Sequence, residues 1–301
     1  MQEFTATPCG TETHLLGEGV RFDEVRGELS WVSVYDGAFL RARADGPDVE
    51  VIARHDLGGQ VGAVAPYEDR ADGWIVARDQ SLYHLGESGA LDALASPEAG
   101  RPDVRLNDGA ADPWGRYWVG SMALDYGPGR GSLFRFHESS GVETVLAGVT
   151  ISNGLGWSAD RRTLYYVDSG PATIYAFDVD RHGDVANQRA WVQLDASRDG
   201  SPDGLCLDAE GAVWVAMWGG RCVRRYAPSG ELLAVVHVAT AQPSCCAIGG
   251  EGATTLYVTT AREDLTEEQL AEDPLAGRMF SVDVGVPGVP LDPYRPTLAA
   301  L

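Results

Sequence analysis

Four short motifs in the sequence place an oxygen-bearing side chain before a glycine. They are Glu18-Gly19, Asn107-Asp108-Gly109, Asn153-Gly154 and Asp203-Gly204. Carboxylate and amide oxygens are the ligands that hard divalent cations such as Ca²⁺, Mg²⁺ and Mn²⁺ prefer. A single pair of this kind is more often a plain turn. The motifs therefore indicate a metal site only if the fold brings them to one place.

The elements that must position these motifs form a unit that occurs six times. Each unit has a short apolar segment, a turn rich in Asp and Gly, a strand centred on a valine and a third strand pattern, and a looser β-segment follows in most. The central valines are Val32, Val76, Val119, Val167, Val215 and Val258. Repeats of about 40–50 residues with four short strands are typical of β-propellers. The sequence therefore predicts an all-β fold, a six-bladed propeller with four-stranded antiparallel blades around a central channel.

The repeats also predict the domain organisation. We expect one domain over residues 1–301, with a core from about 14 to 283 and a Pro/Gly-rich surface tail over 284–301. Residues 11–16 precede the first unit and are predicted to supply an outer strand to the last blade. The one credible helix is an insertion at 264–273, where Thr266 and Gln269 match a capping box.

The propeller predicts where the four motifs meet. The innermost strand of each blade lines the channel, and each motif directly precedes such a strand, with a glycine that permits a tight backbone turn. Two carboxylates, Glu18 and Asp203, and two amides, Asn107 and Asn153, would then converge at one channel mouth. They would repel each other or stay unsatisfied unless a cation neutralised them, so the sequence predicts a divalent metal there.

Composition excludes several classes of partner and mechanism. The net charge of −21 disfavours nucleic acids and anionic membranes, and the chain contains no Lys, which excludes P-loop and Schiff-base lysines. No run of about 18 apolar residues, secretory signal or GxSxG elbow is present. No protein partner is indicated. A cytoplasmic, reducing location is expected from five cysteines without a CxxC spacing, which are Cys9, Cys206, Cys222, Cys245 and Cys246.

Several stretches resemble motifs of one known family. "LGEG", "RLNDGAADPWGRYWVGSM", "ISNGLGWS", "PDGLCLDAEGAVWVA" and "SCCAIGG…LYVTTAR" are similar, in order and spacing, to those of the senescence marker protein 30 (regucalcin)/gluconolactonase family. The similarity runs from about residue 14 to 283. Members are six-bladed propellers with one divalent metal in the channel, and many hydrolyse sugar lactones.

The resemblance implies roles for individual residues. The metal ligands would be Glu18, Asn153 and Asp203. Arg105 and Asn107 match a pair that contacts substrate, and Asn107 would also hold a metal-bound water. The sixth position, Asp125, stands where some relatives carry a glutamate that contacts substrate, and its side chain is one methylene shorter.

Together these residues predict a metal-dependent hydrolase that opens sugar (aldono-)lactones, a gluconolactonase-like carboxylic ester hydrolase. One divalent ion (Ca, Zn, Mn or Mg) would polarise the lactone carbonyl and activate a water. Asp203 is the expected general base, and Arg105 would orient the sugar oxygens. For Arg105 the competing interpretation is a salt bridge with Asp103 or Asp108.

Two other functions fit the same sequence. The first is a calcium-binding or regulatory propeller without turnover, since a metal site alone does not imply catalysis. The second is a propeller esterase or phosphotriesterase acting on aryl esters or phosphotriesters. That activity would require a wider, more aromatic mouth, to which Tyr126, Trp157 and Trp218 would contribute.

Overall fold

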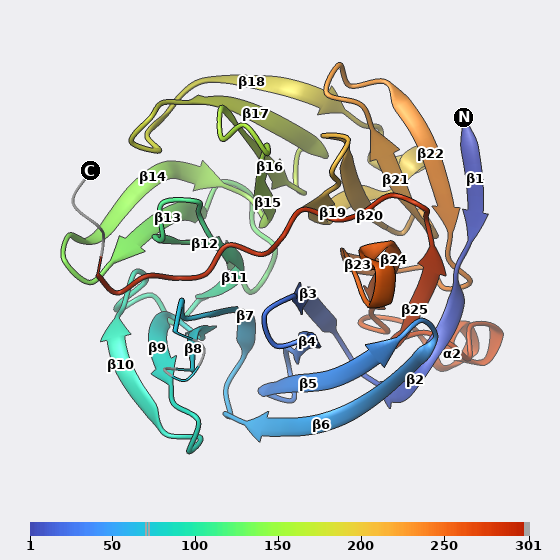
Figure 1. Ribbon diagram of the computed structural model, residues 1–301, viewed down its shortest axis with the longest axis horizontal. Helices are drawn as coiled ribbons and strands as arrows, with labels where there is room; N and C mark the ends of the chain where they lie inside the picture. The colour runs from blue at the N-terminus through green and yellow to red at the C-terminus, as the bar shows by residue number, and fades with distance from the viewer. Residues whose placement is uncertain (70, 72, 298–301) are drawn as a thin grey trace.

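The computed structural model describes residues 1–69, 71 and 73–297, and over these residues the strands form six sheets arranged as blades around a channel (Figure 1). This confirms the predicted six-bladed, all-β propeller. The six central valines all lie in the second strand of a blade and are almost completely buried. Because each valine occupies the same position in its blade, the spacing of the valines equals the length of the repeat.

The first three blades each use four consecutive strands. Blade 1 contains β3 (Gly17–Asp23), β4 (Glu28–Ser33), β5 (Ala38–Asp45) and β6 (Asp48–Asp56). Blade 2 contains β7 (Val61–Pro66), β8 (Trp74–Arg78), β9 (Ser81–Leu85) and β10 (Leu91–Ala95). Blade 3 contains β11 (Val104–Ala111), β12 (Tyr117–Ala123), β13 (Gly131–His137) and β14 (Gly141–Val149). In each blade the first strand lies at the channel (Figure 1).

The last three blades follow the same order, but two of them gain a strand from the N-terminus. Blade 4 contains β15 (Ser152–Trp157), β16 (Thr163–Asp168), β17 (Thr173–Val179) and β18 (Val185–Gln193). Blade 5 contains β19 (Ser201–Leu207), β20 (Val213–Trp218), β21 (Cys222–Tyr226), β22 (Leu232–His237) and β1 (Gln2–Thr5). Blade 6 contains β23 (Pro243–Gly249), β24 (Thr255–Thr260), β25 (Arg278–Asp283) and β2 (Thr7–Thr13).

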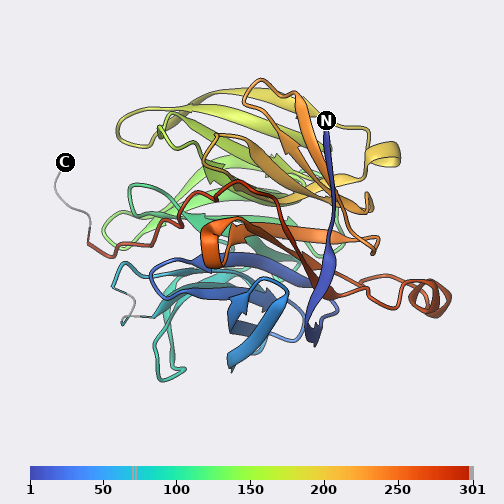
Figure 2. The ribbon, with the colours of Figure 1, turned by 45° about the vertical axis from the view of Figure 1, so that its right-hand side comes forward.

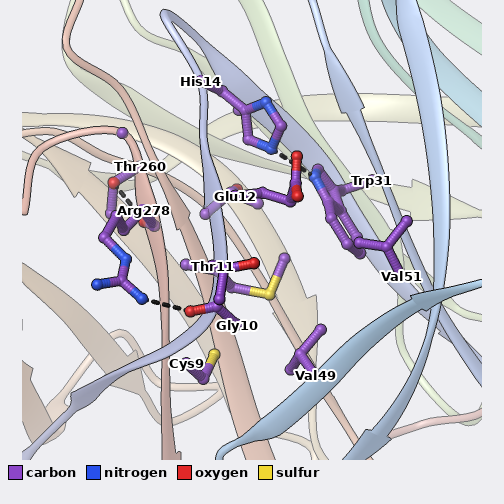
Figure 3. A pocket seen from close by; sticks show the side chains of 14 residues that line it. Cys9, Gly10, Thr11, Glu12, His14, Trp31, Val49, Val51, Thr260 and Arg278 are labelled. Atoms are coloured by element: carbon purple, nitrogen blue, oxygen red, sulfur yellow. Dashed lines mark hydrogen bonds between the residues drawn. The ribbon is translucent and has the colours of Figure 1, made fainter. Parts of the chain in front are cut away.

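The N-terminal segment closes the ring. As predicted, it supplies the outer strand of blade 6, although the strand is β2 at 7–13 rather than 11–16. It continues the other way into blade 5, where β1 pairs in parallel with β22, a strand that the sequence did not predict. Beside β2, the Trp31 indole of blade 1 donates to Nε2 of His14 over 2.9 Å, and Arg278 of blade 6 donates to the Gly10 carbonyl (Figure 3). The segment therefore joins three blades.

The helices are short. The predicted helix in the insertion is α2 (Glu267–Glu272), with Thr266 as N-cap and the expected capping box to Gln269. It projects from the edge of the ring beyond blade 6 (Figure 2). A second helix, α1 (Ala196–Asp199), and a 3-10 turn (Glu251–Ala253) lie in loops. None of the helices in the described part of the chain is long and apolar enough to cross a membrane.

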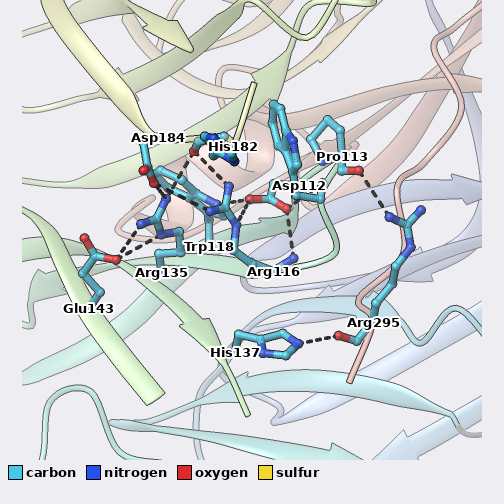
Figure 4. A network of polar contacts seen from close by, with 12 residues as sticks. Asp112, Pro113, Arg116, Trp118, Arg135, His137, Glu143, His182, Asp184 and Arg295 are labelled. Carbon is cyan, nitrogen blue, oxygen red and sulfur yellow. Dashed lines mark hydrogen bonds and ion pairs between the residues drawn. The ribbon is translucent and has the colours of Figure 1, made fainter. Parts of the chain in front are cut away.

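A buried aspartate explains the Asp- and Gly-rich turn in blades 3 and 5. In blade 3, Asp112 is completely buried and accepts hydrogen bonds from the Trp118 indole at 2.8 Å and from Nε of Arg116 at 2.7 Å (Figure 4). In blade 5, Asp208 binds the Trp214 indole in the same way. The aspartate thereby fastens the turn to the aromatic residue of the second strand.

The segment after β25 packs across one end of the channel (Figure 1). Its backbone bonds to the last residues of inner strands, from Val289 to the Leu207 carbonyl and from Tyr294 to the Pro66 carbonyl. Tyr294 is completely buried, and the Arg295 carbonyl lies 2.8 Å from Nε2 of His137 (Figure 4). The segment expected to be a surface tail is thus anchored up to Arg295, while residues 298–301 of that prediction lie outside the described residues. It covers the end at which the inner strands finish, so the other end provides access.

Candidate active site

All six inner strands interrupt their regular pairing near the end of the channel at which they begin. The interruptions fall at Glu18/Arg21, Val61/Ala63, Leu106/Gly109, Ser152/Leu155, Pro202/Leu205 and Pro243/Cys245. Such bulges leave residues unpaired and re-aim their side chains. Each of the four motif residues, Glu18, Asn107, Asn153 and Asp203, lies in or beside a bulge. The repeat therefore presents polar side chains where an ordinary strand would use its backbone for pairing.

Two of the four motif glycines, Gly154 and Gly204, are needed for the close approach of neighbouring inner strands. A Cβ on Gly154 would lie 2.6 Å from the Asp203 carbonyl oxygen, and one on Gly204 would lie 2.5 Å from the Cys245 sulfur. Only Gly19 among the motif glycines has a positive φ, +58°. Gly154 and Gly204 thus let the inner strand of the next blade come close.

The motif residues line a single cavity of about 350 Å³ at this mouth. This volume lies in the range of small-molecule sites. The structure brings together five of the six predicted site residues, all at most 8% exposed. They are Glu18, Arg105, Asn107, Asn153 and Asp203. The remaining lining residues are Leu16, Met122, Tyr126, Ile151, Ser169, Ser201, Trp218, Gln242, Glu263 and Asp264.

A chain of hydrogen bonds orients the amides and the arginine. Nη1 of Arg105 donates to Oδ1 of Asn107 over 2.5 Å, and Nδ2 of Asn107 donates to Oδ1 of Asn153 over 2.8 Å. Nδ2 of Asn153 donates to the Ser169 hydroxyl over 2.7 Å. This fixes which end of each amide is oxygen, and Oδ1 of Asn153 keeps a second lone pair for a further partner.

Arg105 forms neither of the salt bridges that the sequence left open. The Asp103 carboxylate binds Arg130, and Asp108 binds Arg21 at 3.2 Å. The Arg105 guanidinium uses one nitrogen for the Asn107 side chain and the Leu106 carbonyl. Arg105 therefore lines the cavity without a carboxylate partner in the described structure.

The two carboxylates of the site are held in an unfavourable environment. Burial, together with repulsion from Asp108, raises the Glu18 pKa to about 8. Burial, together with repulsion from Glu18 and Asp108, holds the pKa of Asp203 well above its usual range. Glu18 accepts a hydrogen bond from the Gly19 backbone, whereas Oδ1 of Asp203 is buried without a partner in the described structure. An unsatisfied buried acceptor lowers the stability of the fold by about 1–3 kcal/mol, so a cation or a hydrogen-bond donor at this oxygen would stabilise the site.

These residues fit a hard divalent cation. Over the described ranges, no three His, Cys, Asp or Glu side chains lie close enough to form a metal site by themselves. The donors are instead two carboxylates and the amide oxygen of Asn153. A divalent ion would cancel the repulsion between Glu18 and Asp203 and satisfy the unpaired Asp203 oxygen. Three protein donors would leave further coordination positions open.

The structure does not bring Asp125 into the cavity. Its side chain is 68% exposed, and both oxygens bind Nη1 of Arg130 at 2.7 Å. The next residue, Tyr126, lines the cavity instead, with a positive φ of 57°. Asp125 points elsewhere because the chain turns at this residue and Arg130 holds the carboxylate. Trp157 is also outside the site and packs against Trp118, beside a second cavity at the covered end of the channel.

Sequence reasoning missed the contribution of blade 6. Glu263 lines the cavity and accepts hydrogen bonds from the hydroxyls of Tyr126, at 3.0 Å, and Tyr35. Gln242 and Asp264 lie on the same wall. The polar-Gly pattern does not continue into this blade, so the motif that identified the other residues gave no signal here.

Comparison with known proteins identifies the family of this chain. Residues 16–262 match the model of the SMP-30/gluconolactonase/LRE-like region. The chain belongs to this family. The SMP-30/gluconolactonase match covers all the predicted site residues and confirms the resemblance found in the sequence.

Several members of the SMP-30/gluconolactonase family are similar over most of their length. Regucalcin from Sus scrofa is 37% identical over 92% of this chain and 94% of its own. L-Arabinolactonase from Azospirillum brasilense is 36% identical over 91% of this chain and 90% of its own length. The crystal structure of a calcium-binding protein, regucalcin, from Agrobacterium tumefaciens superposes with a TM-score of 0.90 at 27% identity, covering 98% of this chain and 99% of that one. Such relatives agree with an enzyme of the lactonase type.

Proposed function

We propose that this protein is a divalent-metal-dependent hydrolase that opens sugar lactones to the corresponding sugar acids. The observation that carries the proposal is the convergence of Glu18, Asn153 and Asp203 beside Arg105 in one cavity at the end of the channel where the inner strands begin. The similarity to L-arabinolactonase and to 6-deoxy-6-sulfogluconolactonase of Pseudomonas putida, 35% identical over 72% of this chain, supports a lactone substrate.

Glu18, Asn153 and Asp203 would hold the ion. When bound, a divalent ion supplies Lewis-acid polarisation of the lactone carbonyl and lowers the pKa of water. Its charge also keeps Glu18 and Asp203 ionised, against the burial that favours their protonated forms. Ca, Zn, Mn and Mg all suit a set of oxygen donors with open positions.

The chain's own residues would bind the lactone and move the proton. Arg105 would donate its free N–H groups to lactone or sugar oxygens, in an orientation fixed by Asn107. The Asp203 carboxylate would accept the proton of the attacking water as its oxygen bonds to the carbonyl carbon. It would then return that proton to the ring oxygen as the ester C–O bond breaks.

The main alternative is an ion-binding protein without turnover. It is favoured by the similarity to the regucalcin structure from Agrobacterium tumefaciens, which is described as a calcium-binding protein. The same three donors would serve both functions. The cavity wall distinguishes them, since Arg105 binds no carboxylate in the described structure and is available to a substrate. An esterase for bulky substrates has less support, because Tyr126 and Trp218 line the cavity but Trp157 lies at the other end of the channel.

Hydrolysis of a panel of five- and six-carbon aldonolactones, followed with a pH indicator, tests the proposal. Protein treated with chelator should be inactive, and one or more of Ca, Zn, Mn and Mg should restore turnover. Asp203→Asn should lose both ion binding and activity. The matched control is Asp178→Asn, an exposed carboxylate on β17 paired with Arg189, which should retain both. Stoichiometric ion binding without hydrolysis of any lactone would favour the regulatory alternative.

A further inference from the structure

Gln242 carries an unused acceptor at the cavity wall. It directly precedes β23 and is 8% exposed, and its backbone carbonyl accepts from the Ala261 amide at 2.9 Å. Its Nε2 donates to the Glu263 carbonyl over 3.0 Å, whereas Oε1 is buried and has no partner within the described ranges. Exchanging the two ends of the amide would set two carbonyl oxygens against each other. The side chain therefore offers its oxygen, not its nitrogen, to a ligand.

The residues around Gln242 are also acceptors. Glu263 and Asp264 line the same side of the cavity, and the nearby hydroxyls of Tyr35 and Tyr126 already donate to Glu263. We call Gln242, Glu263 and Asp264 the blade 6 wall. It combines two carboxylates with an unpaired amide oxygen, so a ligand approaching it should bring hydrogen-bond donors and no negative charge.

The opposite side of the cavity has the complementary character. Arg105 is on blade 3, which faces blade 6 across the channel (Figure 1). It is the one cation among the described residues that line this cavity. A lactone has acceptors at its carbonyl and ring oxygen and donors at its hydroxyls. Its ester end therefore suits the Arg105 side, and its hydroxyls suit the blade 6 wall.

We propose that the blade 6 wall selects neutral polyhydroxy lactones and rejects lactones that carry a phosphate, sulfonate or carboxylate on the carbon furthest from the ester. The name of the relative 6-deoxy-6-sulfogluconolactonase indicates a sulfonated substrate for that protein, so this specificity would set the chain apart from it. Oε1 of Gln242 accepts a hydrogen bond from a sugar hydroxyl. An anionic group would bring only acceptors to two carboxylates, and the blade 6 wall has no cationic side chain to compensate. This specificity rests on the proposed lactonase function and names its substrate class.

The test measures binding without hydrolysis, by calorimetry with 1,5-anhydro-D-glucitol and its 6-phosphate, which have the sugar ring but no ester. The neutral ring should bind at least tenfold more tightly. Gln242→Leu should lower the affinity for 1,5-anhydro-D-glucitol by about tenfold and leave the affinity for its 6-phosphate almost unchanged. Gln60→Leu is the matched control, since Gln60 precedes the inner strand of blade 2 and does not line the cavity, and it should bind as wild type does.

A second variant keeps the test valid if Gln242→Leu does not fold. Glu263→Gln should raise the affinity for the 6-phosphate and so reduce the difference in affinity between the two compounds. Equal affinity of the wild-type protein for both rings, or tighter binding of the phosphate, would overturn the inference.

Kinetics separate this inference from the proposed function. Glucono-δ-lactone and 6-phosphogluconolactone should differ in kcat/KM by at least tenfold in favour of the neutral lactone. Comparable values for the two would refute the selectivity and leave the lactonase proposal standing. If the protein binds the neutral ring selectively but hydrolyses no lactone, the selectivity of the blade 6 wall is supported and the proposed lactonase function is refuted.

Discussion

Replacing Glu18 by Gln should make the ion-free protein more stable. Glu18 is 8% exposed, and burial and the Asp108 charge raise its pKa from the usual 4.5 to about 8. The folded protein thus holds the proton more tightly than the unfolded chain. The contribution of Glu18 to the free energy of unfolding is therefore most favourable below pH 4.5, falls as the pH rises and levels off above pH 8. An ionisable Glu18 therefore destabilises the ion-free fold at neutral pH.

The size of the effect follows from the pKa. Each pH unit between 4.5 and 8 costs about 1.4 kcal/mol, so the penalty at pH 7 is about 3 kcal/mol. A glutamine of the same length is neutral and can still accept from the Gly19 amide. We expect Glu18→Gln to recover about 1–3 kcal/mol at pH 7 and almost none at pH 4.5. With a saturating ion the order should reverse, since the variant lacks a ligand and only wild type gains from binding.

Urea denaturation at pH 5 and 8, with chelator and with each ion, measures this prediction. The exposed Glu231→Gln is the matched control and should change stability by less than about 0.5 kcal/mol under all conditions. The reasoning is refuted if Glu18→Gln is less stable than wild type in chelator at pH 8. It is also refuted if the difference between the two proteins does not grow with pH.

Three further predictions concern the same cavity. Ion binding should release protons near pH 7, because both carboxylates must lose them, so calorimetric enthalpies should depend on the ionisation enthalpy of the buffer; no dependence would contradict the raised pKa values. Arg105→Ala should reduce lactone turnover at least about tenfold and leave ion affinity unchanged, as measured by kinetics and titration, and wild-type kinetics would remove it from the substrate site. Gly204→Ala should lower stability and ion affinity together, because its Cβ would lie 2.5 Å from the Cys245 sulfur, whereas Gly86→Ala, with nothing closer than 3.9 Å, should affect neither in melting and titration experiments; a tolerated Gly204→Ala would show that close strand approach is not required.

The repeat made the propeller and the core of the site predictable from the sequence. Val32 and its five equivalents occupy the same buried position in each blade. Glu18, Asn107, Asn153 and Asp203 lie in or beside the bulge at the start of each inner strand, so one alignment of the repeats located both sets. Glu18, Asn153 and Asp203 could be found because symmetry alone brings them together. Their roles as metal ligands stay a prediction, as do the cytoplasmic location and the lack of nucleic-acid, membrane and protein partners.

Features that depart from the repeat were not predictable. Tyr126 rather than Asp125 reaches the cavity because of a positive φ and an ion pair with Arg130, neither of which is a repeat property. The strand β1 has no apolar alternation and forms through pairing with a distant edge. Gln242 and Glu263 belong to a blade without the polar-Gly motif. The residues that we propose set specificity are thus those that the symmetry of the fold does not dictate.

Titration of a divalent ion into chelated protein, with the initial rate of aldonolactone hydrolysis and the amount of bound ion measured on the same samples, tests the central claim most directly. The rate should rise in proportion to occupancy and stop rising at one ion per chain. Asp203→Asn should show neither bound ion nor hydrolysis. Full turnover before any ion is bound, or one bound ion per chain without turnover of any lactone, would contradict a metal-dependent lactonase.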